Sequence, residues 1–367
     1  MGFESGSMSF RMFYLAHPLP RDYVQRFAAH AAPPLNALGT EEMHGWVGWR
    51  HLLDRKITEE SIHLAGLLRL TLMRAQRRIP EALLRAECRM EELARMQAEG
   101  RPELDRKTRS AIRKEVRERL LPAMPPELKG MHVAHAPGDE ILYADALSEK
   151  QVDAFVLNVR ETLGFGPLPV TPSTAAIRRA RINVAEIPVT SFSPECDDDF
   201  AENQIGRDFL TWLWFYSEVR TGMIKVDDHG EFGVMLEGPL VFVHGEAGGA
   251  QEIALRRGFP VVSAEAKAAL LSGKKLKRAY LVMVRGQETW RAGVDADEFL
   301  FRGLKLPEGE KLDFISMFQA RMTSLGVFRD VFFALFDRFL KERIDAAAWR
   351  ETQKGIHRWV RERTARK

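Results

Sequence analysis

Hydrophobic and polar positions change rhythm several times along the chain and predict a mixture of strands and helices. Apolar and polar residues alternate at period two over 68–72, which indicates a strand, and residues 10–15 are also predicted to form a short strand. Turn residues separate further predicted strands at 131–134, 141–144, 222–243, 276–284 and 298–304. No repeat with a period of 20–50 residues accompanies them. The predicted class is therefore α+β.

Two adjacent helices are predicted between Pro80 and Pro122. Proline is tolerated in a first helical turn, Gly100-Arg101-Pro102 breaks the first helix, and Asp105 is a candidate N-cap for the second. A narrow apolar seam runs along each of them, formed by Leu83, Met90, Leu93 and Gln97 in the first and by Ile112, Val116 and Leu120 in the second. Seams this narrow predict a helical hairpin that projects from the body or pairs with a partner.

The second half of the chain predicts more helix. Ser148-Glu149-Lys150-Gln151 fits a capping box that opens a helix ending at Gly164, and the prolines at 167, 169 and 172 predict a linker. An aromatic helix then places Phe209, Trp212, Leu213 and Tyr216 at helical spacing, with Trp214 and Phe215 on other faces. Residues 263–271 form a short capped helix. From Lys311 the chain reads as helical to its end and turns basic after Asp345.

The near balance of charge hides segments of opposite sign. Overall 54 Lys and Arg face 51 Asp and Glu, a net charge of +3. Residues 69–119 hold 15 basic against 9 acidic residues, residues 256–291 hold 9 against 2, and residues 338–367 hold 10 against 4. Residues 186–246 instead hold 13 acidic and 3 basic residues. Such asymmetry points to an anionic partner, of which nucleic acid is the commonest, or to charge that merely solvates helix surfaces.

Composition and the first residues exclude several classes of protein. Two cysteines, Cys88 and Cys196, form no disulfide framework and no cysteine zinc site. No apolar run approaches the roughly 20 residues that span a bilayer. The opening residues MGFESGSMSF lack the pattern of a secretory signal and of a myristoylation site. We therefore expect a reduced, cytoplasmic protein.

Motifs that carry chemistry are absent from the sequence, which has no GxGxxG, P-loop, GxSxG or HExxH. His132 and His135 resemble half a metal site, but on a strand residues three apart point to opposite faces. Asp197-Asp198-Asp199 could be a nuclease metal cluster, yet their favourable place at a helix N-terminus explains them. Carboxylates beside Cys196 would raise its pKa and not activate it. We expect no catalytic residue, no metal and no cofactor.

What remains is electrostatic. Cations on separate elements can follow a phosphate backbone without reading bases, and the candidate phosphate contacts are Arg106, Lys107, Arg109, Arg113, Lys114, Arg117, Arg256, Arg257, Lys274, Lys275, Lys277 and Arg278. No recognition helix, zinc finger or RNP motif accompanies them. The pattern predicts duplex binding without sequence preference.

The order of these elements resembles a known family. Residues 79–172, with Leu120-Leu121-Pro122 and Leu168-Pro169-Val170-Thr171-Pro172, are similar to the bacterial recombination-associated protein RdgC. Gly45-Trp46-Val47 looks like that family's GWV segment, and Ser263-Ala264-Glu265 with Gly273-Lys274 looks like its later charged helix and strand. The aromatic helix and the basic tail depart from the pattern of the best-known members.

The resemblance implies a ring-forming homodimer that encircles or clamps double-stranded DNA without sequence preference and restrains RecA-driven recombination, directly or by competition for DNA. It implies no catalysis and a cytoplasmic, nucleoid-associated place. The fold it implies is a central mixed α/β body with a projecting helical hairpin and a β-rich finger domain. Dimer contacts would come from the hairpin and the finger region, and the candidates are Leu83, Met90, Leu93, Phe209, Trp212, Trp214 and Tyr216.

The corresponding division of the chain has six parts. We expect a central domain at 1–78 and 128–185, the helical hairpin at 79–127, the finger at 186–295, returning strand and helices at 296–345, and a basic tail at 346–367. Two other functions remain open. One is a metal-dependent nuclease built on Asp197, Asp198, Asp199 and His132. The other is a protein–protein adaptor in recombination or replication that docks a partner on the aromatic helix.

Overall fold

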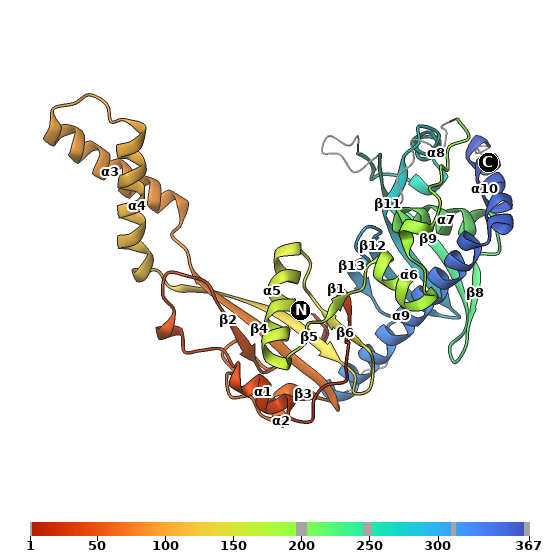
Figure 1. Ribbon diagram of the computed structural model, residues 1–367, viewed down its shortest axis with the longest axis horizontal. Helices are drawn as coiled ribbons and strands as arrows, with labels where there is room; N and C mark the ends of the chain where they lie inside the picture. The colour runs from red at the N-terminus through yellow and green to blue at the C-terminus, as the bar shows by residue number, and fades with distance from the viewer. Residues whose placement is uncertain (1, 196–203, 245–251, 310–312, 363–367) are drawn as a thin grey trace. The chain divides into compact units, whose positions relative to one another are not determined.

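A computed structural model describes residues 2–195, 204–244, 252–309 and 313–362, which divide into two compact units (Figure 1). Unit 1 comprises Met1–Pro18, Ala134–Val156 and Gly166–Lys367, and unit 2 comprises Leu19–Val133 and Leu157–Phe165. Ten α-helices and a large antiparallel arrangement of strands confirm the α+β class for the described residues. The six-part division predicted from the sequence is finer than these two units and stays a prediction.

Unit 2 is built on an antiparallel arrangement of β2 (Met43–Val47), β4 (Leu67–Arg77) and β5 (Pro126–His135), with the short β3 (His63–Leu64) on β4. The helix α1 (Tyr23–Ala29) packs Phe27 edge-on against the Trp46 ring, with centroids 5.0 Å apart. The Trp46 indole donates a 2.7 Å hydrogen bond to Thr162. This indole is therefore satisfied although it is buried.

The strand β4 is buried on both faces, whereas the alternation over 68–72 predicts one solvated face. Arg69 is 1% exposed and donates to the backbone oxygen of Leu70 at 2.7 Å. Its other guanidinium nitrogen lies 2.9 Å from Nδ1 of His132 on β5. A buried cation is tolerated when its donors find acceptors, and the polar positions of β4 are bonded in this way.

Within unit 2, the helices α3 (Glu81–Glu99) and α4 (Arg106–Leu120) lie beyond the ends of β4 and β5 (Figure 1). As predicted, Pro80 precedes α3 and the side chain of Asp105 accepts a 2.7 Å hydrogen bond from the Thr108 amide at the start of α4. Gly100 ends α3 with φ +63, a left-handed conformation that favours glycine. The α3–α4 pair thus follows from local signals.

The apolar contact inside the α3–α4 pair corrects the seam predicted for α3. The buried cluster between the helices consists of Leu84, Cys88, Leu104, Ile112 and Val116. Leu83, Met90 and Leu93 instead lie on the outside, with exposed fractions of 36%, 56% and 49%. The two stripes are one position apart around the helix, and Leu83-Leu84 gives each a leucine.

The sheet of unit 1 has the order β10-β9-β11-β12-β13-β1-β6, with β7 on β1 and β8 on β9. Neighbouring strands are antiparallel, and β11 lies between β9 and β12 with Leu281 opposite Leu236 and Ala292. The strands are β1 (Met8–Tyr14), β6 (Ile141–Ala144), β7 (Leu168–Pro169), β8 (Met223–Val226), β9 (Gly230–Val243), β10 (Ile253–Leu255), β11 (Lys275–Arg285), β12 (Glu288–Asp295) and β13 (Leu300–Lys305).

Helices bury one side of these strands. They are α6 (Pro172–Ala180), α7 (Ile205–Val219), α8 (Ala264–Leu271), α9 (Phe314–Ile344) and α10 (Ala346–Arg361). The ring of Phe209 on α7 lies 6.1 Å from Phe299 and 5.2 Å from Phe336 of α9. Aromatic rings from α7, α9 and the strand region therefore form the core of unit 1.

One local prediction needs correction and two are refined. Residues 167–172 are not a plain linker, because β7 lies there and Pro172 is the first residue of α6, capped by Thr171. The helical C-terminal region predicted from Lys311 consists of two helices that meet at Asp345, which ends α9 and caps α10 through the amides of Ala347 and Ala348. The capping box at Ser148 opens α5 (Glu149–Leu163), whose residues are shared between the two units.

Candidate nucleic-acid interface

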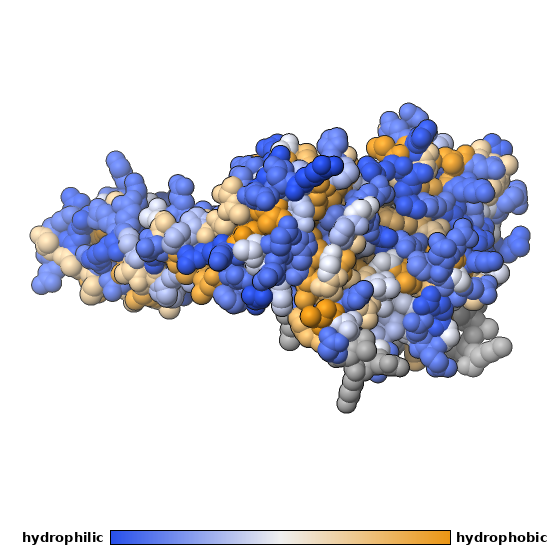
Figure 2. All heavy atoms as spheres, turned by 90° about the horizontal axis from the view of Figure 1, so that it is seen from below, coloured by the Kyte–Doolittle hydropathy of each residue, from blue (hydrophilic) through white to orange (hydrophobic). Residues whose placement is uncertain are grey.

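The helix α4 carries the exposed cations that best suit contact with phosphates. Arg106, Lys107, Arg109 and Arg117 are exposed, and none of the four forms an ion pair with a residue that the structure describes. The eleven residue steps from Arg106 to Arg117 span roughly 16 Å along the helix axis at 1.5 Å per residue. Figure 2 shows a mostly hydrophilic surface over this part of unit 2 at its left end. These four side chains are accessible to a polyanion.

Other predicted contacts on α4 are already paired within the protein. Arg113 lies 3.0 Å from Glu81 of α3, and Lys114 lies 3.9 Å from Glu118. Arg119, one turn further on, contacts Glu87 at 3.0 Å and Glu91 at 2.7 Å. Arg113 and Arg119 thus join α4 to α3. Exposed pairs of this kind contribute little to stability, but a phosphate would have to compete with a carboxylate for each of these cations.

In unit 1, Arg256 and Arg257 follow directly after β10 and are exposed. Neither forms an ion pair with a described residue. They remain candidates for phosphate contact.

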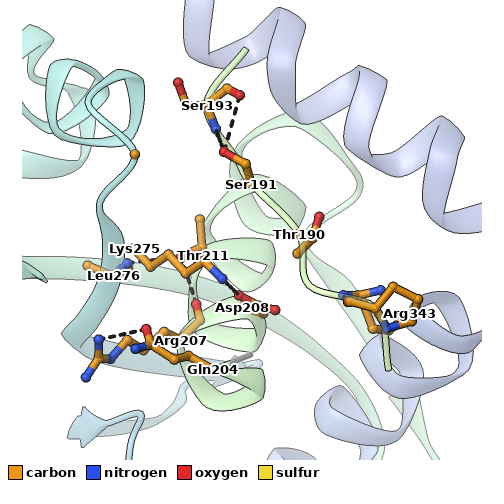
Figure 3. Close-up of polar contacts among 12 residues, drawn as sticks. Thr190, Ser191, Ser193, Gln204, Arg207, Asp208, Thr211, Lys275, Leu276 and Arg343 are labelled. Carbon is orange, nitrogen blue, oxygen red and sulfur yellow. Dashed lines mark hydrogen bonds and ion pairs between the residues drawn. The ribbon is translucent and has the colours of Figure 1, made fainter. Parts of the chain in front are cut away.

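The basic run at 274–278 is corrected by the structure. Lys274 and Lys275 are each 6% exposed, and Nζ of Lys274 donates to the Ser272 hydroxyl at 3.2 Å. Nζ of Lys275 lies 2.6 Å from Oδ1 of Asp208, which is completely buried on α7 (Figure 3). Lysines engaged in the interior are not exposed for phosphate contact, so both are withdrawn as phosphate contacts.

The neighbouring cations are also engaged. Lys277 lies 2.8 Å from Asp297, which also receives Arg207 at 2.6 Å. Arg278, whose side chain is 48% exposed, pairs with Asp295 at 2.6 Å. Residues 275–278 belong to β11 and cannot all point to one face, because side chains alternate along a strand.

Burial governs the electrostatics of the Asp208–Lys275 pair. It raises the pKa of Asp208 above its ordinary value, and the adjacent ammonium of Lys275 opposes that rise. Figure 3 shows the pair between α7 and β11, next to Thr211, whose hydroxyl accepts from the Leu276 amide at 3.1 Å. The Asp208–Lys275 pair therefore has a structural role where α7 packs on β11.

The candidates for metal chemistry do not come together among the described residues. His132 and His135 lie on β5; His132 contacts Arg69 and Thr71, and His135 is buried with Nδ1 3.1 Å from the Ile141 oxygen. Within the described ranges, no three or more His, Cys, Asp or Glu side chains are grouped to hold a metal ion. Asp197, Asp198, Asp199 and Cys196 lie outside those ranges.

The candidate dimer contacts separate into two groups. Leu83, Met90 and Leu93 form an exposed stripe on α3 and remain candidates. Phe209, Trp212, Trp214 and Tyr216 are each 0% exposed and pack inside unit 1. Trp212 stacks on Tyr216 at 5.0 Å, and Trp214 meets Trp359 of α10 edge-on at 4.7 Å. These four side chains are core and are withdrawn as contacts, which also removes the docking face assumed for an adaptor.

Two exposed basic surfaces are absent from the candidate phosphate contacts named from the sequence, although a basic tail at 346–367 was predicted. Arg350, Lys354 and Arg358 occupy one face of α10 at spacing i, i+4, i+8, a signal that is visible in the sequence after Asp345. The loop after β2 carries Arg50 stacked at 5.7 Å over the Trp49 ring, with Arg55 and Lys56 exposed nearby in the sequence. A basic stretch around a tryptophan was the available signal there.

Comparison with known proteins agrees with the resemblance seen in the sequence. Residues 14–182, a little under half of the chain, match the family model described as "RdgC: Putative exonuclease, RdgC". The matched range contains all of unit 2, including the α3–α4 pair, and ends before α7. No curated protein matches the chain. Among the described residues, no helix is both long and apolar enough to cross a membrane. The match suggests a recombination-associated DNA-binding protein.

Proposed function

We propose that this protein binds double-stranded DNA without sequence preference and restrains RecA-driven recombination by occupying the duplex. The observation that carries the proposal is the set of exposed cations on α4, which are Arg106, Lys107, Arg109 and Arg117 and have no ion-pair partner among the described residues. Side chains of this kind neutralise phosphates and displace counter-ions, so affinity should fall steeply with salt. The RdgC match over residues 14–182, which includes α4, supports the same partner.

In this proposal the protein acts as a homodimer that encircles or clamps the duplex. The exposed stripe of Leu83, Met90 and Leu93 on α3 supports a contact with a second copy, because a contiguous apolar stripe gains free energy when it is covered. A twofold contact would bring the same stripe of both copies together.

Solution mass and retention on DNA test this arrangement. The wild-type protein should have the mass of a dimer, and a Met90→Glu/Leu93→Glu variant should have the mass of a monomer with unchanged helix content. Wild-type protein should stay on closed-circular DNA at a salt concentration that releases it from short linear DNA. Equal loss of the protein from circular and linear DNA would contradict encirclement. Binding through phosphates is tested separately, by the dependence of affinity on salt.

The proposed role involves no catalysis, and the competing function is a nuclease. The nuclease alternative is tested directly, because the matched family is described as a putative exonuclease. End-labelled duplex incubated with excess protein and Mg²⁺ or Mn²⁺ should remain intact. Shortening of the labelled strand, at a rate that follows protein concentration and not contaminant content across preparations, would replace the proposal with the nuclease.

A further inference from the structure

A cleft of about 480 Å³ lies in unit 1 between the segment 181–190 and the junction of α9 and α10. Its size is that of a site for a small ligand or for one or two side chains. Part of its lining is apolar and open to solvent: Val189 is 38% exposed and Ile344 is 53% exposed, with Ile182 and Pro188 beside them. Exposed apolar groups that line a concave surface are typical of a binding site.

The rim of this cleft is cationic. Arg181 and Arg350 line it, are exposed, and form no ion pair with a described residue. Arg343 also lines it but is 4% exposed; its guanidinium donates to the Pro188 oxygen and lies 4.6 Å above the Trp349 ring. Glu186 is an acidic residue of the lining. The two exposed arginines leave positive charge at the entrance of an apolar hollow.

The positive charge continues along α10 away from the cleft. Arg350, Lys354, Arg358 and Arg361 lie on one face of the helix, and the last three line a shallow adjoining surface with His357 and Glu362. Lys354 is paired with Glu351 at 2.8 Å, while Arg358 has no ion pair with a described residue. The distance from Arg350 to Arg361 along the axis is roughly 16 Å. An extended peptide covers that distance with about five residues.

We propose that this surface binds a short acidic segment of a partner protein, with one apolar side chain in the cleft and its neighbouring carboxylates along α10. The apolar lining of the cleft and the cationic face of α10 each match one half of such a segment. This inference does not depend on the proposed binding of DNA, which is assigned to α4.

The geometry favours a peptide over nucleic acid at this position. Single-stranded nucleic acid gains affinity by stacking bases on aromatic rings, but the Trp349 ring is 6% exposed and lies beneath Arg343. Trp349 also uses its indole N–H on the Thr190 hydroxyl at 3.2 Å. A phosphate backbone has no apolar group that would fill the space beside Val189 and Ile344. An apolar side chain next to carboxylates satisfies both the hollow and its rim.

The test uses the full-length protein and a fluorescein-labelled peptide with four Asp or Glu residues followed by Leu-Phe. Fluorescence anisotropy should show saturable binding that weakens with salt. Replacing the Leu-Phe pair by Ser-Ser should weaken binding at least about tenfold, because the gain from burying the anchor is lost. This substitution is made in the peptide, so its result cannot arise from misfolding of the protein.

Protein variants locate the site. Arg350→Glu/Arg358→Glu should weaken peptide binding at least about tenfold, whereas Arg256→Glu/Arg257→Glu, with the same change of charge on exposed residues, should leave it within about twofold. Neither Arg350→Glu nor Arg358→Glu should change the number of phosphate contacts made by α4. If the reversal variant melts at a lower temperature than wild type, Arg350→Gln/Arg358→Gln replaces it.

Three results would overturn the inference. One is the absence of binding at about 1 mM peptide, and another is equal binding of the Leu-Phe and Ser-Ser peptides, which would leave a non-specific electrostatic contact. The third is displacement of the peptide by duplex or single-stranded DNA together with loss of DNA affinity in Arg350→Glu/Arg358→Glu. That result would assign the face of α10 to nucleic acid.

Discussion

Removing the four cations of α4 that have no ion-pair partner within the described ranges should change the salt dependence of DNA binding by an amount that can be calculated. The variant is Arg106→Ala/Lys107→Ala/Arg109→Ala/Arg117→Ala. Each phosphate contact contributes about 0.9 to the slope of log affinity against log salt. If all four side chains of one copy contact phosphates, the slope should therefore become shallower by about 3.6.

The consequence for affinity is large enough to measure. Between 50 and 200 mM salt, a slope difference of about 3.6 corresponds to roughly a 150-fold difference in how much affinity is lost. Wild-type protein should lose that much more affinity over this range than the variant does. Fluorescence anisotropy on two duplexes of equal length and unrelated sequence gives the slopes, and both duplexes should respond equally.

A matched control removes the same charge from the same helix pair. In Arg89→Ala/Arg95→Ala/Arg113→Ala/Arg119→Ala, each lost cation is already paired with a glutamate, at 3.3, 3.7, 3.0 and 3.0 Å. Its slope should change by less than half as much as in the first variant, although its net charge is identical. Circular dichroism must show that both variants keep α3 and α4. Equal slopes in wild type and the first variant, or equal changes in both variants, would refute the assignment of phosphate contacts to these four cations of α4.

Three further predictions concern stability. Asp208→Asn should lower the free energy of unfolding by about 3–5 kcal/mol, because it leaves the buried ammonium of Lys275 without its carboxylate partner. The double variant Asp208→Leu/Lys275→Met should lose less free energy of unfolding than Asp208→Asn. Urea titrations measure both losses, and a larger loss in the double variant would contradict the pairing. Ile112→Ala should cost about 2–5 kcal/mol, since Ile112 is 1% exposed between α3 and α4, and a loss below about 0.5 kcal/mol in the same assay would show that the cluster does not hold the helices. The hydrogen bond from the Thr108 amide holds the pKa of Asp105 below 3.8, so the contribution of this cap is present at neutral pH and lost as pH falls through that lowered pKa. The protection factor of the Thr108 amide, in which the intrinsic pH dependence of exchange is divided out, should therefore fall in wild type as the pH drops through that lowered pKa and should change less in Asp105→Asn, whose amide still caps but does not titrate; an equal fall in both proteins would show that the cap is not responsible.

Signals that act within one turn or one strand could be predicted from the sequence. Asp105 caps α4 and Ser263 caps α8 through an amide three residues later, and the Ser148–Gln151 box opens α5. Each depends on neighbours in the chain, because a cap satisfies an amide within the first turn. The class of the fold follows from the same local rhythm of apolar and polar residues.

The burial of charged groups could not be predicted, because it depends on contacts between distant segments. Lys275 belongs to a run that looks solvated, and its interior position is decided by Asp208 on α7. Likewise Arg69 reads as the polar face of a strand until β5 brings His132 against it. No feature of the sequence near Lys275 or near Arg69 identifies the distant residue that contacts it.

The side of α3 that packs against α4 could not be predicted for a different reason. Leu83 and Leu84 are adjacent, so two stripes about 100° apart fit a helix almost equally well. Arg113 and Ile112 on α4 select between them, since packing of the buried cluster and the ion pair with Glu81 both require Leu84 to face inward. The exposed stripe that remains is the one available to a second copy.

Asp345 is the single residue between α9 and α10, so no loop separates the two helices. One carboxylate caps the first turn of α10 through the amides of Ala347 and Ala348, directly after the last turn of α9. The 31 residues of α9 reach roughly 46 Å back into the same unit, where Phe328 meets the ring of Phe10 on β1. A single helix therefore connects the start of α10 to the aromatic core that packs on β1.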